Sequence, residues 1–226
     1  MDREVTLLDY ERNKAFIKSK EEVYQFIKRT FDIIMGILGC AILFPIMIIV
    51  KICYVLSGDF DQIIFVQRRI GKDGKEFDFY KFRSMIKNAD EVLFQMLEEN
   101  EDLRKEYEIN KKLKNDPRIT KIGKFLRKTS LDELPQMVNV LAGEMSLIGN
   151  RPYLPREKKD MGKYYSDIIK TKPGLSGLWQ VSGRSKTTFK KRLKIESYYS
   201  NNCGLKMDIK IFFKTFKVVL KMCGAK

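Results

Sequence analysis

Two adjacent acidic residues, Asp132 and Glu133, are the side chains in this sequence best placed to do chemistry. An ionised carboxylate can attack phosphorus to form an aspartyl phosphate, and a second carboxylate can help to hold Mg²⁺. Three cations, Lys124, Arg127 and Lys128, precede the pair and could bind the phosphates of a substrate. The pattern therefore indicates phosphoryl chemistry, although the same acids could serve only to cap a helix.

The composition removes several other kinds of active site. The 226 residues include no His, which excludes Ser-His-Asp and Cys-His catalysis and leaves carboxylates, Lys, Tyr, Cys or an oxygen-bound metal ion. With 44 Lys and Arg against 29 Asp and Glu, the net charge is +15. The partners should therefore be anionic, such as phospholipid headgroups, nucleotides or nucleic acid, and charge alone does not choose among them.

The acidic pair is expected at the start of a helix. Ser130 and Glu133 have the spacing of a capping box, Pro135 leaves the first helical residue open, and Gly143 is a typical stop. Free N–H groups and the dipole at a helix N-terminus would favour the ionised acids. The expected buried stripe of this helix consists of Leu134, Met137, Val138 and Leu141.

An uncharged run over residues 33–50 predicts a membrane helix. Such a helix would extend about 27 Å, just short of a ~30 Å hydrocarbon core, so one interpretation is a spanning helix. Against it, Pro45 predicts a kink, and basic residues flank the run on both sides, Lys28 and Arg29 before it and Lys51 after it. Symmetric basic flanks favour a re-entrant, hairpin-like helix that enters and leaves by the same leaflet.

The remainder is expected to be an α+β domain, mainly helical, with one β-hairpin and amphipathic surface helices. Residues 63–82 predict strand, turn and strand, with the turn at 71–74. Residues 86–114 predict one or two solvated helices. A last helix carries an apolar face and a lysine face between Ile209 and Cys223, which suits either an anionic bilayer surface or a core helix with solvated lysines.

Six stretches carry a family resemblance: KRTFD at 28–32 leading into the segment with Pro45, VQRRIGKDG at 66–74, FYKFRSM at 79–85, RKTSLDELPQ at 127–136, MSLIG at 145–149 and KPGLSGLWQVSGR at 172–184. In order and spacing they resemble the bacterial sugar transferase family, the monotopic polyprenyl-phosphate phosphoglycosyl transferases. The matching stretches extend over about residues 28–220. Larger relatives carry additional transmembrane helices and a further domain, so this chain resembles the small catalytic form of the family.

The resemblance implies three parts and a two-step reaction. A polar lead-in over 1–27, flexible or lying on the surface, precedes a re-entrant membrane helix over 28–57 and a cytoplasmic catalytic domain over 58–226. Asp132 would attack the sugar-bearing phosphate of a UDP-sugar, release UMP and hold the sugar phosphate covalently. Polyprenyl (undecaprenyl) phosphate would then accept it, initiating exopolysaccharide, capsule or glycan assembly at the cytoplasmic face of the membrane. Asp132 and Glu133 would hold Mg²⁺, whose charge offsets that of the diphosphate.

By position in the matching motifs, further residues would complete the site. Those expected to bind phosphate or nucleotide are Lys81, Arg127, Arg151 and Arg184, with Glu196 and Asp208 as further polar groups. Each also has a purely structural interpretation: Lys81 as a solvated strand residue, Arg184 as a loop cap, Asp208 as the start of the last helix. Two departures from the family are Asn150, where Gly-Pro-Arg-Pro is usual and a less rigid loop is expected, and Glu196, where Asp is commoner.

Two other functions stay open at this point. The chain could be a non-enzymatic basic adaptor at the membrane surface, or a phosphatase that uses Asp132 on a lipid-linked phosphate. The expected partners of the transferase are a UDP-sugar, polyprenyl phosphate and membrane lipid, without nucleic acid. Neither the sugar, the glycan pathway nor the oligomeric state follows from the sequence.

Overall fold

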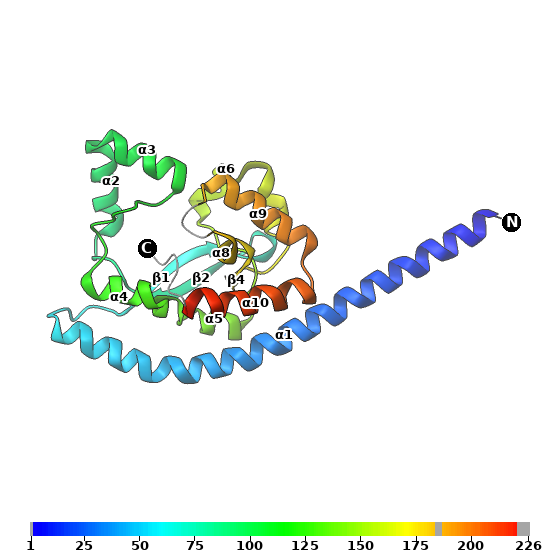
Figure 1. The fold of residues 1–226 in the computed structure, drawn as a ribbon, viewed down its shortest axis with the longest axis horizontal. Coiled ribbons are helices and arrows are strands. Elements are labelled where there is room, and N and C mark those ends of the chain that lie inside the picture. Colours follow the sequence, from blue (N-terminus) through cyan, green and yellow to red (C-terminus); the bar gives the residue numbers. More distant parts are fainter. Residues whose placement is uncertain (1, 184–186, 221–226) are drawn as a thin grey trace.

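A single long helix, α1 (Asp2–Leu56), dominates the N-terminal part of the fold. The computed structural model describes residues 2–183 and 187–220. In Figure 1, α1 extends well beyond the domain at its N-terminal end and curves along one side of the domain at the other. Its part Lys18–Leu56 is long and apolar enough to cross a membrane, judged by length and composition.

Helix α1 is continuous, which differs from the expected flexible or surface-lying lead-in and from the expected hairpin-like membrane helix. The polar residues before 28 are helical and run directly into the apolar segment, and Pro45 lies inside the helix rather than at the tip of a hairpin. Proline removes one backbone hydrogen bond, but it need not end a helix that neighbouring structure supports on both sides. Here Leu43 and Val50, on either side of Pro45, are both buried against the domain.

The other elements form a mainly helical α+β domain, as predicted. They are β1 (Ile64–Ile70), β2 (Glu76–Phe82), α2 (Ala89–Glu99), α3 (Glu101–Asn110), α4 (Lys121–Thr129), α5 (Gln136–Ala142), β3 (Ser146–Ile148), α6 (Lys158–Met161), α7 (Tyr165–Ile168), β4 (Gly174–Ser176), α8 (Leu178–Ser182), α9 (Phe189–Asn202) and α10 (Leu205–Leu220). The expected last helix is therefore present, and Cys223, its expected end, lies outside the described residues.

The predicted β-hairpin is confirmed. Strands β1 and β2 pair antiparallel, with Ile64 opposite Phe82 and Ile70 opposite Glu76. The turn contains Asp73 and Gly74, both with positive φ (57° and 77°), which suits the glycine. Figure 1 shows the hairpin crossing the middle of the domain, between α9 on one side and α5 and α10 on the other.

A second sheet was not expected from the sequence. Strands β3 and β4 pair in parallel, with Ser146 opposite Gly174 and Ile148 opposite Ser176. The contact is so close that a Cβ at Gly174 would lie 2.1 Å from the backbone nitrogen of Gly149. Position 174 therefore requires glycine. The pairing of β3 with β4 also determines where the loop after Ile148 begins.

Helix α5 packs on α1, which corrects the expected buried stripe. Val138 is exposed, whereas Met137 and Leu141 are half-buried because they meet α1 at Gly39 and Gly36. The face that enters the domain carries Asn139, which accepts a hydrogen bond from Tyr80 N (3.2 Å) and donates to Asp78 O (2.6 Å). Met137 and Leu141 thus mark the side of α5 that packs on α1, and a satisfied amide ties α5 to β2.

Both ends of the apolar segment are bound to the same domain. At the N-terminal end, Arg29 donates to Val140 O (2.7 Å) and Leu141 O (2.8 Å), at the carboxyl end of α5. At the other end, Lys51 donates to Phe60 O and Asp61 O, each at 3.2 Å. Arg29 and Lys51 therefore bind protein carbonyls. Their positions on both sides of the apolar run are explained by these contacts, and are not by themselves evidence for a re-entrant helix.

Candidate functional site

The acidic pair lies in a short 3₁₀ turn, Leu131–Glu133, between α4 and α5. The expected capping box is absent, because Ser130 is the left-handed C-cap of α4 (φ 59°) and its side chain makes no capping bond. An N-cap requires an extended backbone, which this residue does not have. Gly143 does end α5, with φ 86°, as predicted. The acids therefore precede the helix at a sharp change of chain direction.

Asp132 is half-buried and lies within the influence of three cations. Burial raises the pKa of its carboxyl group, while the positive charges of Arg127, Lys81 and Arg151 act to lower it. Three residues predicted to bind phosphate are thus brought around the predicted nucleophile, from α4, β2 and the loop after β3. Their charges favour the ionised carboxylate that burial disfavours.

A cleft of about 820 Å³ lies beside this group. Asp132 does not itself line the cleft, but the three cations that act on it do. Lys and Arg outnumber Asp and Glu in its lining, and these basic residues include Arg69, Lys81, Lys112, Arg127, Arg151 and Arg192. A volume of this size is typical of a small-molecule pocket, and its lining is suited to a polyanion.

The β-hairpin supplies one face of the cleft. In the antiparallel register Phe65 is opposite Lys81 and Arg69 is opposite Phe77, so these residues share a face. The Lys81 ammonium lies 5.2 Å from the Phe65 ring centroid. Burial, followed by the charges of Arg69 and Arg127, lowers the pKa of Lys81 to about 8. Lys81 is therefore mostly charged at physiological pH but loses its proton only slightly above it.

Arg127 and Arg151 are held in place by neighbouring groups. Arg127 Nε donates to Ser84 Oγ at 2.9 Å, in the strand-to-helix connection. Next to Arg151, the side chain of Asn150 is buried and donates to Ser200 Oγ at 2.5 Å. The asparagine amide thus anchors the loop that carries Arg151 to α9 through a hydrogen bond.

Glu196 lies behind this loop, fully buried. It accepts hydrogen bonds from the Tyr153 hydroxyl and from the backbone N–H of Arg151, the latter at 3.2 Å. Burial raises the pKa of Glu196 to about 7, although Tyr153 and Arg192 act to lower it. The residue does not line the cleft and instead positions Arg151.

Asp208 is not brought to the cleft. Its carboxylate accepts hydrogen bonds from Tyr24 (2.8 Å) and Tyr199 (2.7 Å) and pairs with Lys28. It therefore joins α1 to α9 and α10, which is the structural interpretation rather than the substrate-binding one. Arg184, also a predicted site residue, lies outside the described residues.

Two cleft residues, Arg69 and Arg192, were missed by reasoning from the sequence. Arg69 had a usable signal, because strand alternation places it on the same face as Lys81. Arg192 had none, since its position depends on how α9 packs against Tyr153 and Trp179.

The acidic pair fits a magnesium ion only together with a substrate. Among the described residues, no group of three or more His, Cys, Asp or Glu side chains could hold a metal ion. Asp132 and Glu133 do offer carboxylates within a single turn. Mg²⁺ usually takes one or two protein carboxylates and completes its octahedron with water and substrate phosphates, so this donor set is sufficient.

Comparison with known proteins covers nearly the whole chain. The sequence model of the family described as "Bacterial sugar transferase" matches residues 23–222. The chain is 46% identical over 225 residues to an undecaprenyl-phosphate galactose phosphotransferase of Salmonella typhimurium, which covers 98% of this chain and 45% of that protein. It is 35% identical over 202 residues to a UDP-glucose:undecaprenyl-phosphate glucose-1-phosphate transferase of Escherichia coli K12, with 85% and 40% covered.

A shorter relative matches over most of both chains. This is the exopolysaccharide production protein ExoY of Sinorhizobium fredii, 38% identical over 198 residues, with 88% of this chain and 87% of that protein covered. By contrast, the chain spans about half the length of the Salmonella relative. The matched region includes the acidic pair, the hairpin and the loop that carries Arg151.

Proposed function

Because the chain belongs to the bacterial sugar transferase family, we propose that it transfers a sugar phosphate from a UDP-sugar to polyprenyl phosphate. The names of two relatives support this reaction, since each describes a sugar-phosphate transfer to undecaprenyl phosphate. The single observation that carries the proposal is the Asp132 carboxylate beside three cations that line a basic cleft. The galactose and glucose in those names leave the sugar of this chain open.

In the first step an Asp132 oxygen attacks the phosphorus that bears the sugar. The bond from that phosphorus to the bridging oxygen breaks, and the bridging oxygen keeps the electron pair and leaves as part of UMP. The sugar phosphate stays on Asp132 as an acyl phosphate. Lys81, Arg127 and Arg151 reduce the repulsion between the carboxylate and the diphosphate.

In the second step a phosphate oxygen of the polyprenyl acceptor attacks the same phosphorus. The bond to Asp132 breaks and returns its electron pair to the carboxylate, so the products are UMP and a polyprenyl diphosphate sugar. No general base is needed, because both nucleophiles are already anionic. The absence of His from the chain therefore does not hinder either step.

Glu133 and Asp132 are the residues that would hold Mg²⁺ in this reaction. When bound, the ion supplies positive charge to the diphosphate oxygens. The chain's own cations around the cleft would supply the remaining neutralisation.

The enzyme would sit on the cytoplasmic face of the membrane as a monotopic protein. Both ends of the apolar segment of α1 bind the same domain, through Arg29 and Lys51. A segment held in this way would lie along one leaflet, which supports a monotopic arrangement, although the continuous helix through Pro45 does not form the hairpin of the re-entrant interpretation. We call the exposed apolar side chains along α1, α5 and α10 the apolar underside; they include Ile34, Ile37, Phe44, Ile48, Val138, Phe213 and Phe216.

The acceptor can reach the cleft from the bilayer. Asp61 and Gln62, which follow shortly after α1, line the cleft, so the cleft extends to the end of the membrane helix. A lipid phosphate at headgroup level would meet the basic lining there, while UDP-sugar enters from the cytoplasm.

The test is a UMP-release assay with a panel of UDP-sugars, undecaprenyl phosphate and Mg²⁺. Wild-type protein should release UMP, and Asp132→Asn should lower the rate at least a thousandfold, because an amide is not a competent nucleophile. Flotation with vesicles should be the same for both proteins, which controls for membrane attachment.

Three outcomes would contradict the proposal. Equal UMP release by Asp132→Asn would remove the nucleophile. Release of inorganic phosphate in place of UMP would indicate a phosphatase. Salt-sensitive vesicle binding with no turnover of any UDP-sugar would indicate an adaptor.

A further inference from the structure

Two arginines in the cleft are buried with unsatisfied polar atoms. Arg69 and Arg192 are only 6% and 9% exposed, and both line the cleft. The Nε atom of each has no hydrogen-bond partner among the described residues. A buried guanidinium with an unused donor is costly, so such a pair in one cleft indicates a missing acceptor.

Among the described residues, neither arginine forms a direct ion pair with an acid. Arg69 donates to Pro152 O (3.1 Å) and to Gln67 Oε1 (2.7 Å), which are both uncharged acceptors. Within the described part of the chain, Arg69, Arg151 and Arg192 form no ion pair closer than 4.0 Å. Burial and then the charge of Arg151 lower the pKa of Arg69 to about 9, and the more distant charge of Glu157 only partly opposes them.

Aromatic rings hold these guanidinium groups in place. The Arg192 guanidinium lies 4.8 Å from the Phe189 ring centroid and 5.0 Å from that of Trp179. Arg151 lies over the same Trp179 ring at 5.8 Å, and Arg69 lies over Phe79 at 5.2 Å. Stacking uses the flat faces of a guanidinium and leaves its in-plane N–H groups available for an anion.

Arg151 links this group to the acidic pair. Its charge acts on Asp132, Lys81 and Arg127, and also on Arg69. The cleft therefore holds Lys81 and Arg127, whose charges act on Asp132, and next to them Arg69, on which the charges of Arg151 and Arg192 act. A diphosphate ester likewise presents two neighbouring anionic groups.

We propose that Arg69, Arg151 and Arg192 form a second anion subsite, which holds the phosphate of the nucleotide that leaves in the first step. The proposal rests on the transfer reaction proposed above. When the bridging P–O bond breaks, negative charge grows on the UMP oxygen. Prearranged buried donors stabilise that charge more than they stabilise the intact diphosphate.

The first experiment measures binding of UMP and of inorganic pyrophosphate to the full-length protein by calorimetry. Arg69→Met and Arg192→Met should each weaken UMP binding about tenfold or more. Arg68→Met and Lys191→Met are matched controls, because each removes one charge next to a test residue: Arg68 is exposed and pairs with Asp78 across the strands, and Lys191 is exposed on α9. Both controls should change the affinity less than twofold.

Thermal unfolding of each variant separates binding from folding. If a methionine variant unfolds, Arg69→Lys and Arg192→Lys keep the charge but lose the fork of donors, and they should still weaken UMP binding several-fold. Unchanged UMP affinity in folded variants of both arginines would overturn the subsite. An equal loss in the two controls would overturn it too, since the effect would then be one of net charge.

The two measurements, UMP release and UMP binding, distinguish a wrong subsite from a wrong transfer reaction. If wild type releases UMP from a UDP-sugar while the Arg69 and Arg192 variants bind UMP normally, the subsite is wrong and the transfer stands. If wild type turns over no UDP-sugar but binds UMP and pyrophosphate through these two arginines, the subsite stands and the transfer is wrong.

Discussion

Glu196 is buried without an ion-pair partner closer than 4.0 Å among the described residues, and the folded state holds its proton tightly. Its pKa is raised from 4.5 to about 7, so the folded protein binds this proton more strongly than the unfolded chain. The stabilising contribution is fully present below about pH 4.5 and is lost as the pH rises through 7.

Glu196→Gln should remove this part of the pH dependence. Between pH 4.5 and 7, the free energy of unfolding of wild type should fall relative to that of the variant, by up to about 3 kcal/mol. Urea unfolding across this range measures the difference. Parallel curves for the two proteins would contradict the assignment.

The lowered pKa of Lys81 predicts that the enzyme binds its substrate less well at alkaline pH. Its pKa of about 8 means that the free enzyme loses a phosphate-binding cation above that pH. The value of kcat/KM for the UDP-sugar, which reports the free enzyme, should therefore decline above about pH 8. In Lys81→Arg the decline should move to higher pH, because the guanidinium keeps its charge. The same limit in both proteins would assign it to another group.

The site residues were predictable to different degrees. Asp132, Glu133, Lys81, Arg127 and Arg151 carry motif signals, and the structure brings the three cations together around Asp132. The role expected of Asp208 was not supported, because whether a buried carboxylate faces substrate or two tyrosines depends on packing that no local pattern encodes. Arg192 escaped for the same reason, whereas Arg69 could have been found from the strand alternation that places it on the same face as Lys81.

At the scale of elements, the contact between α1 and α5 depends on Arg29. Its guanidinium donates to two carbonyls at the carboxyl end of α5, where a cation also complements the helix dipole. Arg29→Met should destabilise the domain by about 1–3 kcal/mol and increase hydrogen exchange in α5. Lys18→Met is the control, since Lys18 is exposed on the same helix and its ion pair with Glu22 is long, at 4.0 Å. Equal effects of both substitutions would contradict a specific contact.

Elements with a repeating pattern were predictable, and short ones were not. Alternation with a glycine-containing turn correctly predicted β1 and β2. Strands β3 and β4 have three residues each, too few to show alternation, and they exist because Gly149 and Gly174 let two backbones approach closely. An apolar stripe usually marks the side of a helix that faces the domain core. In α5, Asn139 faces inward and bonds the backbone of β2, while apolar residues of the stripe pack on α1.

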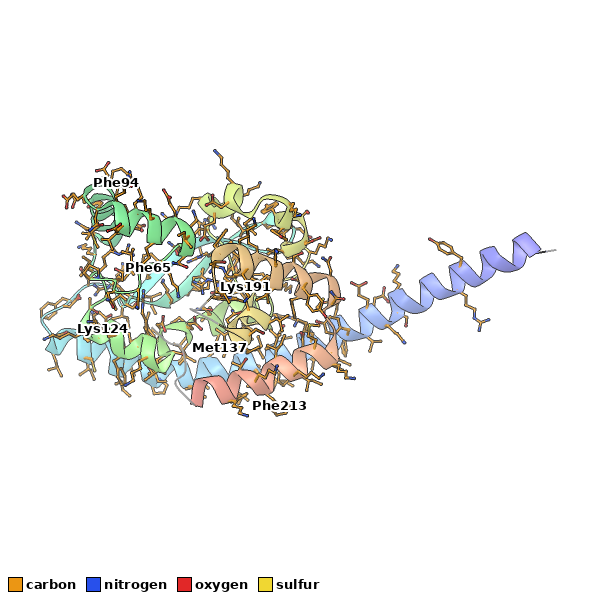
Figure 2. All side chains as sticks on the ribbon, turned by 45° about the horizontal axis from the view of Figure 1, so that its top comes forward. Phe65, Phe94, Lys124, Met137, Lys191 and Phe213 are labelled. Atoms are coloured by element: carbon orange, nitrogen blue, oxygen red, sulfur yellow. The ribbon has the colours of Figure 1, made fainter. Side chains whose placement is uncertain are left out.

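At the scale of the molecule, two exposed phenylalanines can test the proposed membrane side against the opposite side. Phe213 is 67% exposed and Phe94 is 63% exposed. Figure 2 shows Phe213 beside α10, next to α1, and Phe94 at the far end of the domain. Of these two residues, Phe213 belongs to the apolar underside and Phe94 does not.

Phe213→Asp should therefore lower the vesicle partition coefficient by about tenfold, from the lost burial of one aromatic ring in lipid. Phe94→Asp should leave it unchanged, because that surface faces water. Flotation assays measure the partition, and UMP release in detergent should be unaffected by either change. An equal loss of vesicle binding in both variants would place the membrane elsewhere.

Because α1 is fastened to the catalytic body at two points, it cannot swivel about either of them. If the proposed membrane arrangement holds, the distance between the cleft and the lipid phosphates would be set by packing inside the protein, and not by the reach of a flexible tether. The isoprenoid tail of the proposed acceptor would stay in the hydrocarbon while only its charged end rises. Encounter with that acceptor would then be a search in two dimensions, and the glycolipid product would leave along the same plane.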